Sequence, residues 1–146
     1  MKTEWTVEEA AAAMAADELV YIDIRSRAEV ETGLPAGAWH IPLYDSATTG
    51  AMEVNQGFVA EVAALLAASA PRRCAVACAH GVRSRQAVEI LRLSGIEIDE
   101  VPGGWDGLRD GWGQVLAAGW SHLPLPTEPT PAAARSHAAV LGLLAG

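Results

Sequence analysis

The chain has 146 residues, of which 51% are hydrophobic and 19% are charged, and its net charge is −8. This composition is typical of one globular domain and excludes a disordered chain. The negative charge argues against nucleic-acid binding, which needs a cationic face, and no apolar run approaches the roughly 20 residues that span a bilayer.

The first part of the chain predicts a helix, a strand and a second helix. A capping box at residues 6–9 opens a helix that runs to about Ala16. Residues 19–24 form an apolar run of strand length, typical of a strand buried on both faces of a parallel sheet. A second capping box, at residues 26–29, predicts a short helix that stops at Gly33.

The rest of the chain continues this alternation. The predicted elements are a strand at 38–41, a loop at 44–56, a helix at 58–68, a strand at 74–78, a helix at 82–94, a strand at 96–101 and a helix at 105–118. The pattern predicts an α/β fold with a mainly parallel sheet of about five strands and helices on both faces. Prolines follow Trp120, so we expect a domain at 1–120 and a Pro-rich linker with a short apolar helix or tail at 121–146.

The two cysteines, Cys74 and Cys78, lie at the two ends of one predicted strand. Their Cα atoms would be about 13 Å apart, too far for a disulfide. The spacing does not fit a zinc site, and the four histidines form no ligand cluster, so we expect no metal. Residues 1–5 and the alanine-rich stretch after them lack a secretory signal pattern, which predicts a cytoplasmic protein.

The segment at 78–84 carries the chemistry. Cys78 ends a strand, and in open α/β sheets ligands bind at that end of the strands. Gly81 permits a left-handed backbone, and the amides that open the next helix favour a thiolate. Arg83 adds a fixed positive charge suited to an oxyanion. These features favour a reactive thiol for Cys78, whereas we expect Cys74 to be a small buried core residue.

Four segments of the chain form a recognisable set: YIDIR at 21–25, GLPAGAWHIP at 33–42, the pattern C-x-x-G-x-R followed by serine at 78–84, and VPGG at 101–104. Together they resemble the rhodanese family, and the likeness runs over most of residues 3–120. The resemblance implies a three-layer rhodanese-like fold and a sulfurtransferase that uses no cofactor.

The resemblance also implies a reaction. The Cys78 thiolate would take the outer sulfur of thiosulfate or another small anionic donor, and would pass it from a persulfide to cyanide, a thiol or a protein acceptor. Neither nucleic acid nor membrane is expected as a partner. The persulfide would be held by the active-site loop: Ala79, His80, Gly81, Val82, Arg83 and Ser84.

The chain departs from the family pattern at three places. Leu34 stands where a histidine is common, and Ala79 where a second cation is common, which leaves the donor open. Leu108 stands at the usual place of a tryptophan in the last helix, and Trp112 or Trp120 would fill that space.

Other residues have two interpretations each. Asp23 and Arg25 end a neighbouring strand, and a bracing ion pair is a better expectation for them than direct catalysis. His80 suits a general base but is better explained as an exposed loop residue. Trp39 lines either the site or the core.

Three other functions are weaker. A phosphatase or arsenate reductase of the same fold uses a longer Cys-x5-Arg loop, whereas Arg83 arrives one residue early. A non-catalytic binding or regulatory module typically lacks the cysteine, so Cys78 and Arg83 disfavour it, while a slow sensor that stores a persulfide on Cys78 stays open. A disulfide reductase needs a resolving cysteine, and Cys74 is too far away.

Overall fold

The computed structural model describes residues 3–47 and 49–145. Four residues lie outside the described part: 1 and 2 at the start of the predicted domain, 48 in the predicted loop and 146 at the end of the predicted tail.

A parallel sheet in the order β3-β1-β6-β7 forms the middle layer. Its strands are β1 (Leu19–Asp23), β3 (Trp39–His40), β6 (Arg73–Ala77) and β7 (Asp99–Glu100). A parallel bridge from Glu4 to Glu100 adds a fifth segment at one edge. The predicted mainly parallel sheet is therefore confirmed, although β7 is shorter than the strand predicted at 96–101.

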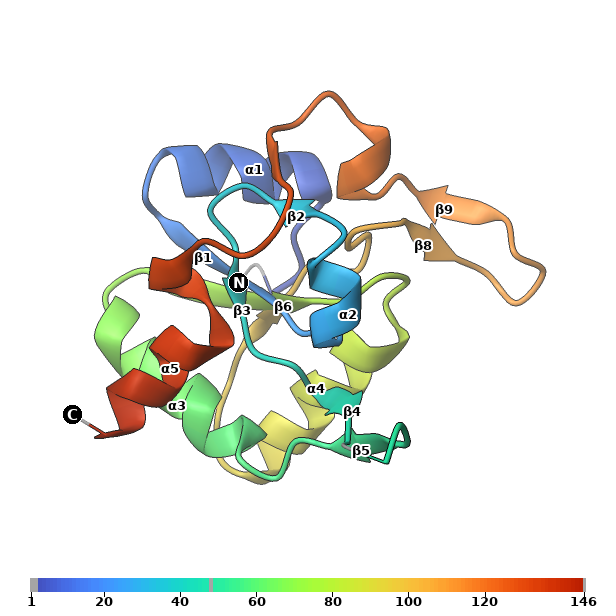
Figure 1. Ribbon diagram of the computed structural model, residues 1–146. Helices are drawn as coiled ribbons and strands as arrows, with labels where there is room; N and C mark the ends of the chain where they lie inside the picture. The colour runs from blue at the N-terminus through green and yellow to red at the C-terminus, as the bar shows by residue number, and fades with distance from the viewer. Residues whose placement is uncertain (1–2, 48, 146) are drawn as a thin grey trace.

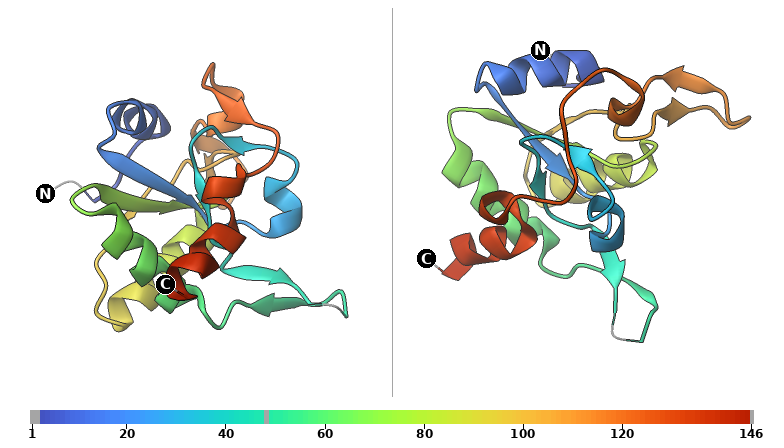
Figure 2. Two further views of the ribbon diagram at one scale, coloured as in Figure 1. Left: turned by 60° about the vertical axis from the view of Figure 1, so that its left-hand side comes forward. Right: turned by 45° about the horizontal axis from the view of Figure 1, so that its top comes forward.

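Helices cover both faces of the sheet (Figures 1 and 2). They are α1 (Val7–Ala15), α2 (Arg27–Val30), α3 (Phe58–Ser69), α4 (Val82–Leu93) and α5 (His137–Ala145). One apolar cluster joins α3, α4 and α5 to the sheet, and a second cluster joins α1 and α2 to its other face. The predicted three-layer α/β fold is confirmed.

The sequence signals for these elements act locally. Both predicted capping boxes form: the Thr6 hydroxyl accepts from the Glu9 amide, and the Ser26 hydroxyl from the Glu29 amide. All five residues of β1 are buried, because Val20 and Ile22 face one apolar cluster while Leu19 and Tyr21 face the other.

The helix predicted at 105–118 is wrong. This stretch forms a hairpin of β8 (Leu108–Arg109) and β9 (Val115–Ala117) that projects from the body (Figure 1). Three glycines lower its helix propensity, and the Asp110 carboxylate accepts from the backbone amides of Trp112 and Gln114, which fixes a turn. The loop predicted at 44–56 likewise contains a hairpin, with strands β4 (Tyr44–Ser46) and β5 (Met52–Val54).

The residues after the hairpin fold back onto the body. Trp120 is buried and lies edge-on to Tyr21, with ring centroids 5.6 Å apart, so it belongs to the core, whereas Trp112 is 92% exposed. Strand β10 (Thr127–Glu128) pairs with β2 (Leu34–Pro35). Two 3-10 turns, Trp120–His122 and Ala133–Arg135, lead to α5, which packs on α3.

Candidate active site

Cys78 lies directly after β6, at the carboxyl edge of the sheet. Because β1 and β6 run parallel with Asp23 opposite Ala77, the loop after β6 and the end of β1 meet at this edge. The Cys78 side chain is almost fully buried at 1% exposure. Cys74 lies inside the strand, where burial raises the pKa of its thiol. Both cysteines are free thiols and are not joined in a disulfide.

The sulfur of Cys78 is held by the first turn of α4. The backbone amides of Gly81 and Ser84 donate to Sγ at 3.2 and 3.3 Å, and the thiol donates to Ser84 Oγ at 3.5 Å. Gly81 caps α4 with φ of 90°, as the sequence predicted. Two aligned amides at a helix start favour a negative charge on this sulfur.

A second segment, residues 102–108, fixes the loop from the other side. The Trp105 amide donates to the Cys78 carbonyl at 2.9 Å, and the Asp106 amide donates to the Ala79 carbonyl at 3.0 Å. A Cβ on Gly104 would overlap the Cys78 carbonyl oxygen, which explains the second glycine of the VPGG segment.

Arg83 is held in an ion pair with Glu29. Its two terminal nitrogens donate to the two Glu29 carboxylate oxygens at 2.6 and 3.0 Å. Burial alone would raise the pKa of Glu29, but hydrogen bonds from Arg83 and Ser26 lower it to about 2. The sequence marked Glu29 as the end of a capping box and gave no sign of this partner.

Asp23 and Arg25 form a buried bidentate pair. Arg25 Nε donates to Asp23 Oδ1 at 3.0 Å, and Arg25 Nη2 donates to Oδ2 and to the Gly33 carbonyl, both at 2.8 Å. The guanidinium carbon lies 4.9 Å from the ring centroid of Trp105. The pair therefore connects the end of β1 to the segment that holds the loop.

His80 is half-buried and held in place. Nδ1 lies 3.1 Å from the Gly107 carbonyl oxygen, and Nε2 lies 3.2 Å from Asp106 Oδ2. Asp106 also contacts His122, from its other oxygen at 2.8 Å. His80 thus ties the loop to the base of the β8–β9 hairpin.

Ser84 connects the sulfur to a buried carboxylate. Its hydroxyl donates to Glu100 Oε2 at 2.8 Å. Burial raises the pKa of Glu100, and the hydrogen bond from Ser84 offsets only part of this rise. The sequence did not point to Glu100, because it lies on β7, 16 residues from Ser84.

Two loop residues remain, Ala79 and Val82. Ala79 is buried and Val82 is exposed, and the structure records no side-chain contact from either of them to the Cys78 sulfur. In residues 3–47 and 49–145, no three His, Cys, Asp or Glu side chains gather as metal ligands. No helix in this part of the chain is both long and apolar enough to cross a membrane.

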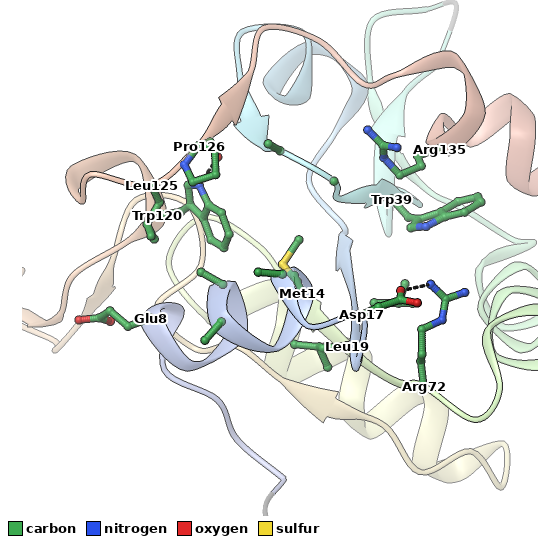
Figure 3. A pocket seen from close by; sticks show the side chains of 16 residues that line it. Glu8, Met14, Asp17, Leu19, Trp39, Arg72, Trp120, Leu125, Pro126 and Arg135 are labelled. Atoms are coloured by element: carbon green, nitrogen blue, oxygen red, sulfur yellow. Dashed lines mark hydrogen bonds and ion pairs between the residues drawn. The ribbon is translucent and has the colours of Figure 1, made fainter.

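A pocket of about 640 Å³ lies at the other end of the sheet, beside the start of β1 (Figure 3). Trp39 lines this pocket and not the Cys78 loop. Its two arginines are already paired, Arg72 with Asp17 and Arg135 with Glu128. No residue of the Cys78 loop is among those that line this pocket.

The fold and the loop together define a rhodanese-like α/β protein. The family model of the rhodanese-like domain matches residues 6–110, and the chain belongs to this family. A comparison with curated proteins gives no match.

Solved structures share this fold. Rv0390 from M. tuberculosis is 25% identical, with a TM-score of 0.61 over 86% of this chain and 96% of that one. A rhodanese-related protein from Thermoplasma volcanium is 20% identical, with a TM-score of 0.52 over 86% and 97% of the two chains. The rhodanese-like domain of Alr3790 from Anabaena sp. is 21% identical, with a TM-score of 0.52 over 90% and 86%.

Proposed function

We propose that the protein is a sulfurtransferase that carries sulfur as a persulfide on Cys78. The observation that carries the proposal is the pair of backbone amides, from Gly81 and Ser84, that point at the Cys78 sulfur from the start of α4. Such donors stabilise a thiolate before the reaction and a persulfide anion after it.

The reaction has two halves. The Cys78 thiolate attacks the outer sulfur of a small anionic donor such as thiosulfate, the S–S bond of the donor breaks, and its electron pair leaves with sulfite. The persulfide then gives its outer sulfur to cyanide, a thiol or a protein acceptor, and the thiolate is restored. The proposed chemistry needs neither a metal nor an organic cofactor. We propose that the protein works in the cytoplasm and has neither nucleic acid nor membrane as a partner.

The loop length favours sulfur transfer over phosphoryl transfer. Arg83 is the fifth residue after Cys78, and its guanidinium is turned to Glu29. A tetrahedral oxyanion needs donors on all sides. The loop offers two amides to one sulfur atom, which fits a single added sulfur.

Mass measurement of the intact protein tests the proposal. The reduced protein is treated with thiosulfate, the donor is removed, and we expect a gain of one sulfur, about 32 Da. Cys78→Ser should gain nothing, and Cys74→Ser is the matched control that should gain the same mass.

Two other results would change the interpretation of Cys78. If neither thiosulfate nor other persulfide donors add sulfur to Cys78, the proposal is wrong. If the sulfur is added but no acceptor removes it, a persulfide-sensing module explains the site better than an enzyme does.

A further inference from the structure

A chain of three buried groups leads from the Cys78 sulfur to a carboxylate. The thiol donates to Ser84 Oγ at 3.5 Å, and the Ser84 hydroxyl donates to Glu100 Oε2 at 2.8 Å. Each of the three residues is at most 4% exposed. The thiol proton of Cys78 is therefore directed at Ser84 Oγ, and the hydroxyl proton of Ser84 is directed at Glu100.

We propose that this chain is a proton relay in which Glu100, acting through Ser84, accepts the proton of the Cys78 thiol. The inference rests on the proposed function, because it supplies the thiolate that the sulfur transfer uses.

The transfer balances without creating charge. The thiol proton moves to Ser84 Oγ while the hydroxyl proton of Ser84 moves to Glu100, so the negative charge passes from the carboxylate to the sulfur. Ser84 then donates to the thiolate, which gains a third donor beside the amides of Gly81 and Ser84. In the persulfide the charge lies on the outer sulfur, so these three donors act on the thiolate before loading and after transfer, when the proton returns to the restored thiolate.

The surroundings of Glu100 suit a proton acceptor. Burial in the sheet disfavours its charged form, and the nearby Glu4 carboxylate acts in the same direction. Arg85 opposes this, with Nη2 3.3 Å from Oε1, but its side chain is 55% exposed, so solvent screens its charge. The backbone of β7 is fixed here by the Trp5 amide, which donates to the Glu100 carbonyl at 2.9 Å. A carboxylate with raised proton affinity is better matched to a thiol than an exposed one.

The pH dependence of two rates at Cys78 tests the relay. In a Cys74→Ser background, sulfur loading from thiosulfate and alkylation by iodoacetamide are measured for Glu100→Gln, Ser84→Ala and the double variant. We expect each single variant to be slower by roughly 10² on the acid side of neutrality. The double variant should be no slower than the single ones, and all rates should converge at high pH, where the thiolate forms without the relay.

Glu89→Gln is the matched control. Glu89 is an exposed residue of the same helix as Ser84, and its recorded side-chain contact is an ion pair with Arg92 at 3.2 Å, so its loss should leave both rates unchanged. The relay is wrong if Glu100→Gln reacts as fast as the parent or faster at every pH, as expected if Glu100 were only a negative charge that disfavours the thiolate.

The two readouts separate this inference from the proposed function. Alkylation needs the thiolate but no sulfur transfer, so it tests the relay even in a protein that loads no sulfur. If Glu100→Gln fails to fold, Ser84→Ala keeps the relay falsifiable, because it retains the Ser84 backbone amide that donates to the sulfur, and parent rates in this variant would overturn the relay.

Discussion

At the scale of single residues, Glu29 connects the loop to the rest of the domain. Its carboxylate accepts from both terminal nitrogens of Arg83 and from the Ser26 backbone amide, so one side chain caps α2 and fixes the start of α4. These bonds stabilise the ionised carboxylate more than burial disfavours it, which holds the Glu29 pKa at about 2 against an ordinary value of 4.5.

The lowered pKa of Glu29 predicts a specific loss of stability in acid. Because the folded-state pKa is below the unfolded value, the contribution is fully present above pH 4.5 and is lost as the pH falls toward 2. Glu29→Gln keeps the capping box and should lower the free energy of unfolding by about 1 to 2 kcal/mol near neutrality, discounted because the side chain is 36% exposed.

Urea unfolding at a series of pH values measures this difference. The difference in free energy of unfolding between the parent and Glu29→Gln should shrink to near zero by pH 2. Glu31→Gln is the control at the end of the same helix, since Glu31 is the C-cap of α2 and its recorded side-chain contact is an exposed ion pair with Arg27. A Glu29→Gln difference that does not change with pH would contradict the assignment.

At the scale of elements, the sequence was informative where the signal was local. Capping boxes located α1 and α2, an apolar run located β1, and the contiguous C-x-x-G-x-R pattern located the loop. The helix predicted at 105–118 failed because its apolar residues suggested a helix that three glycines and Asp110 prevent.

The partners of the loop could not be predicted in this way. Arg83 and Glu29 are 54 residues apart, and Ser84 and Glu100 are 16 residues apart on different elements. Such contacts depend on how β1, β6 and β7 are ordered in the sheet. A single sequence does not specify that order with the precision that one hydrogen bond needs.

The C-terminal helix α5 gives a prediction at this scale. Val140 is fully buried against α3 and the sheet, whereas its neighbour Leu141 is 44% exposed. Val140→Ala should lower the free energy of unfolding by about 2 kcal/mol, and Leu141→Ala, which removes more carbon, by less than about 0.5 kcal/mol. Urea unfolding compares the two, and equal small effects would show that α5 does not pack on the core.

At the scale of the whole molecule, charge shapes access to the site. The net charge is −8, and three arginines of the loop and its neighbourhood have carboxylate partners. The pairs are Arg25 with Asp23, Arg83 with Glu29, and Arg85 with Glu100 and Glu4. Under the proposed function, a dianionic donor would therefore gain little from these cations and would be repelled by the molecule as a whole.

Two donors of similar shape test this effect. Thiosulfate carries two negative charges and methanethiosulfonate carries one, and both transfer their outer sulfur to a thiolate, with sulfite or methanesulfinate as the leaving group. We expect loading of Cys78 from thiosulfate to accelerate more strongly with added salt, because the Debye length falls to about 10 Å at 0.1 M and screens the repulsion.

Glu29→Gln should change the preference between the two donors, because it leaves the Arg83 charge without its carboxylate. One added interaction with the second charge of thiosulfate, about 1 kcal/mol at partial exposure, would raise the thiosulfate-to-methanethiosulfonate ratio of loading rates roughly fivefold. Using the ratio removes the different intrinsic reactivities of the donors. Glu31→Gln changes the net charge equally, so an equal rise in that variant would assign the effect to overall charge and not to Arg83.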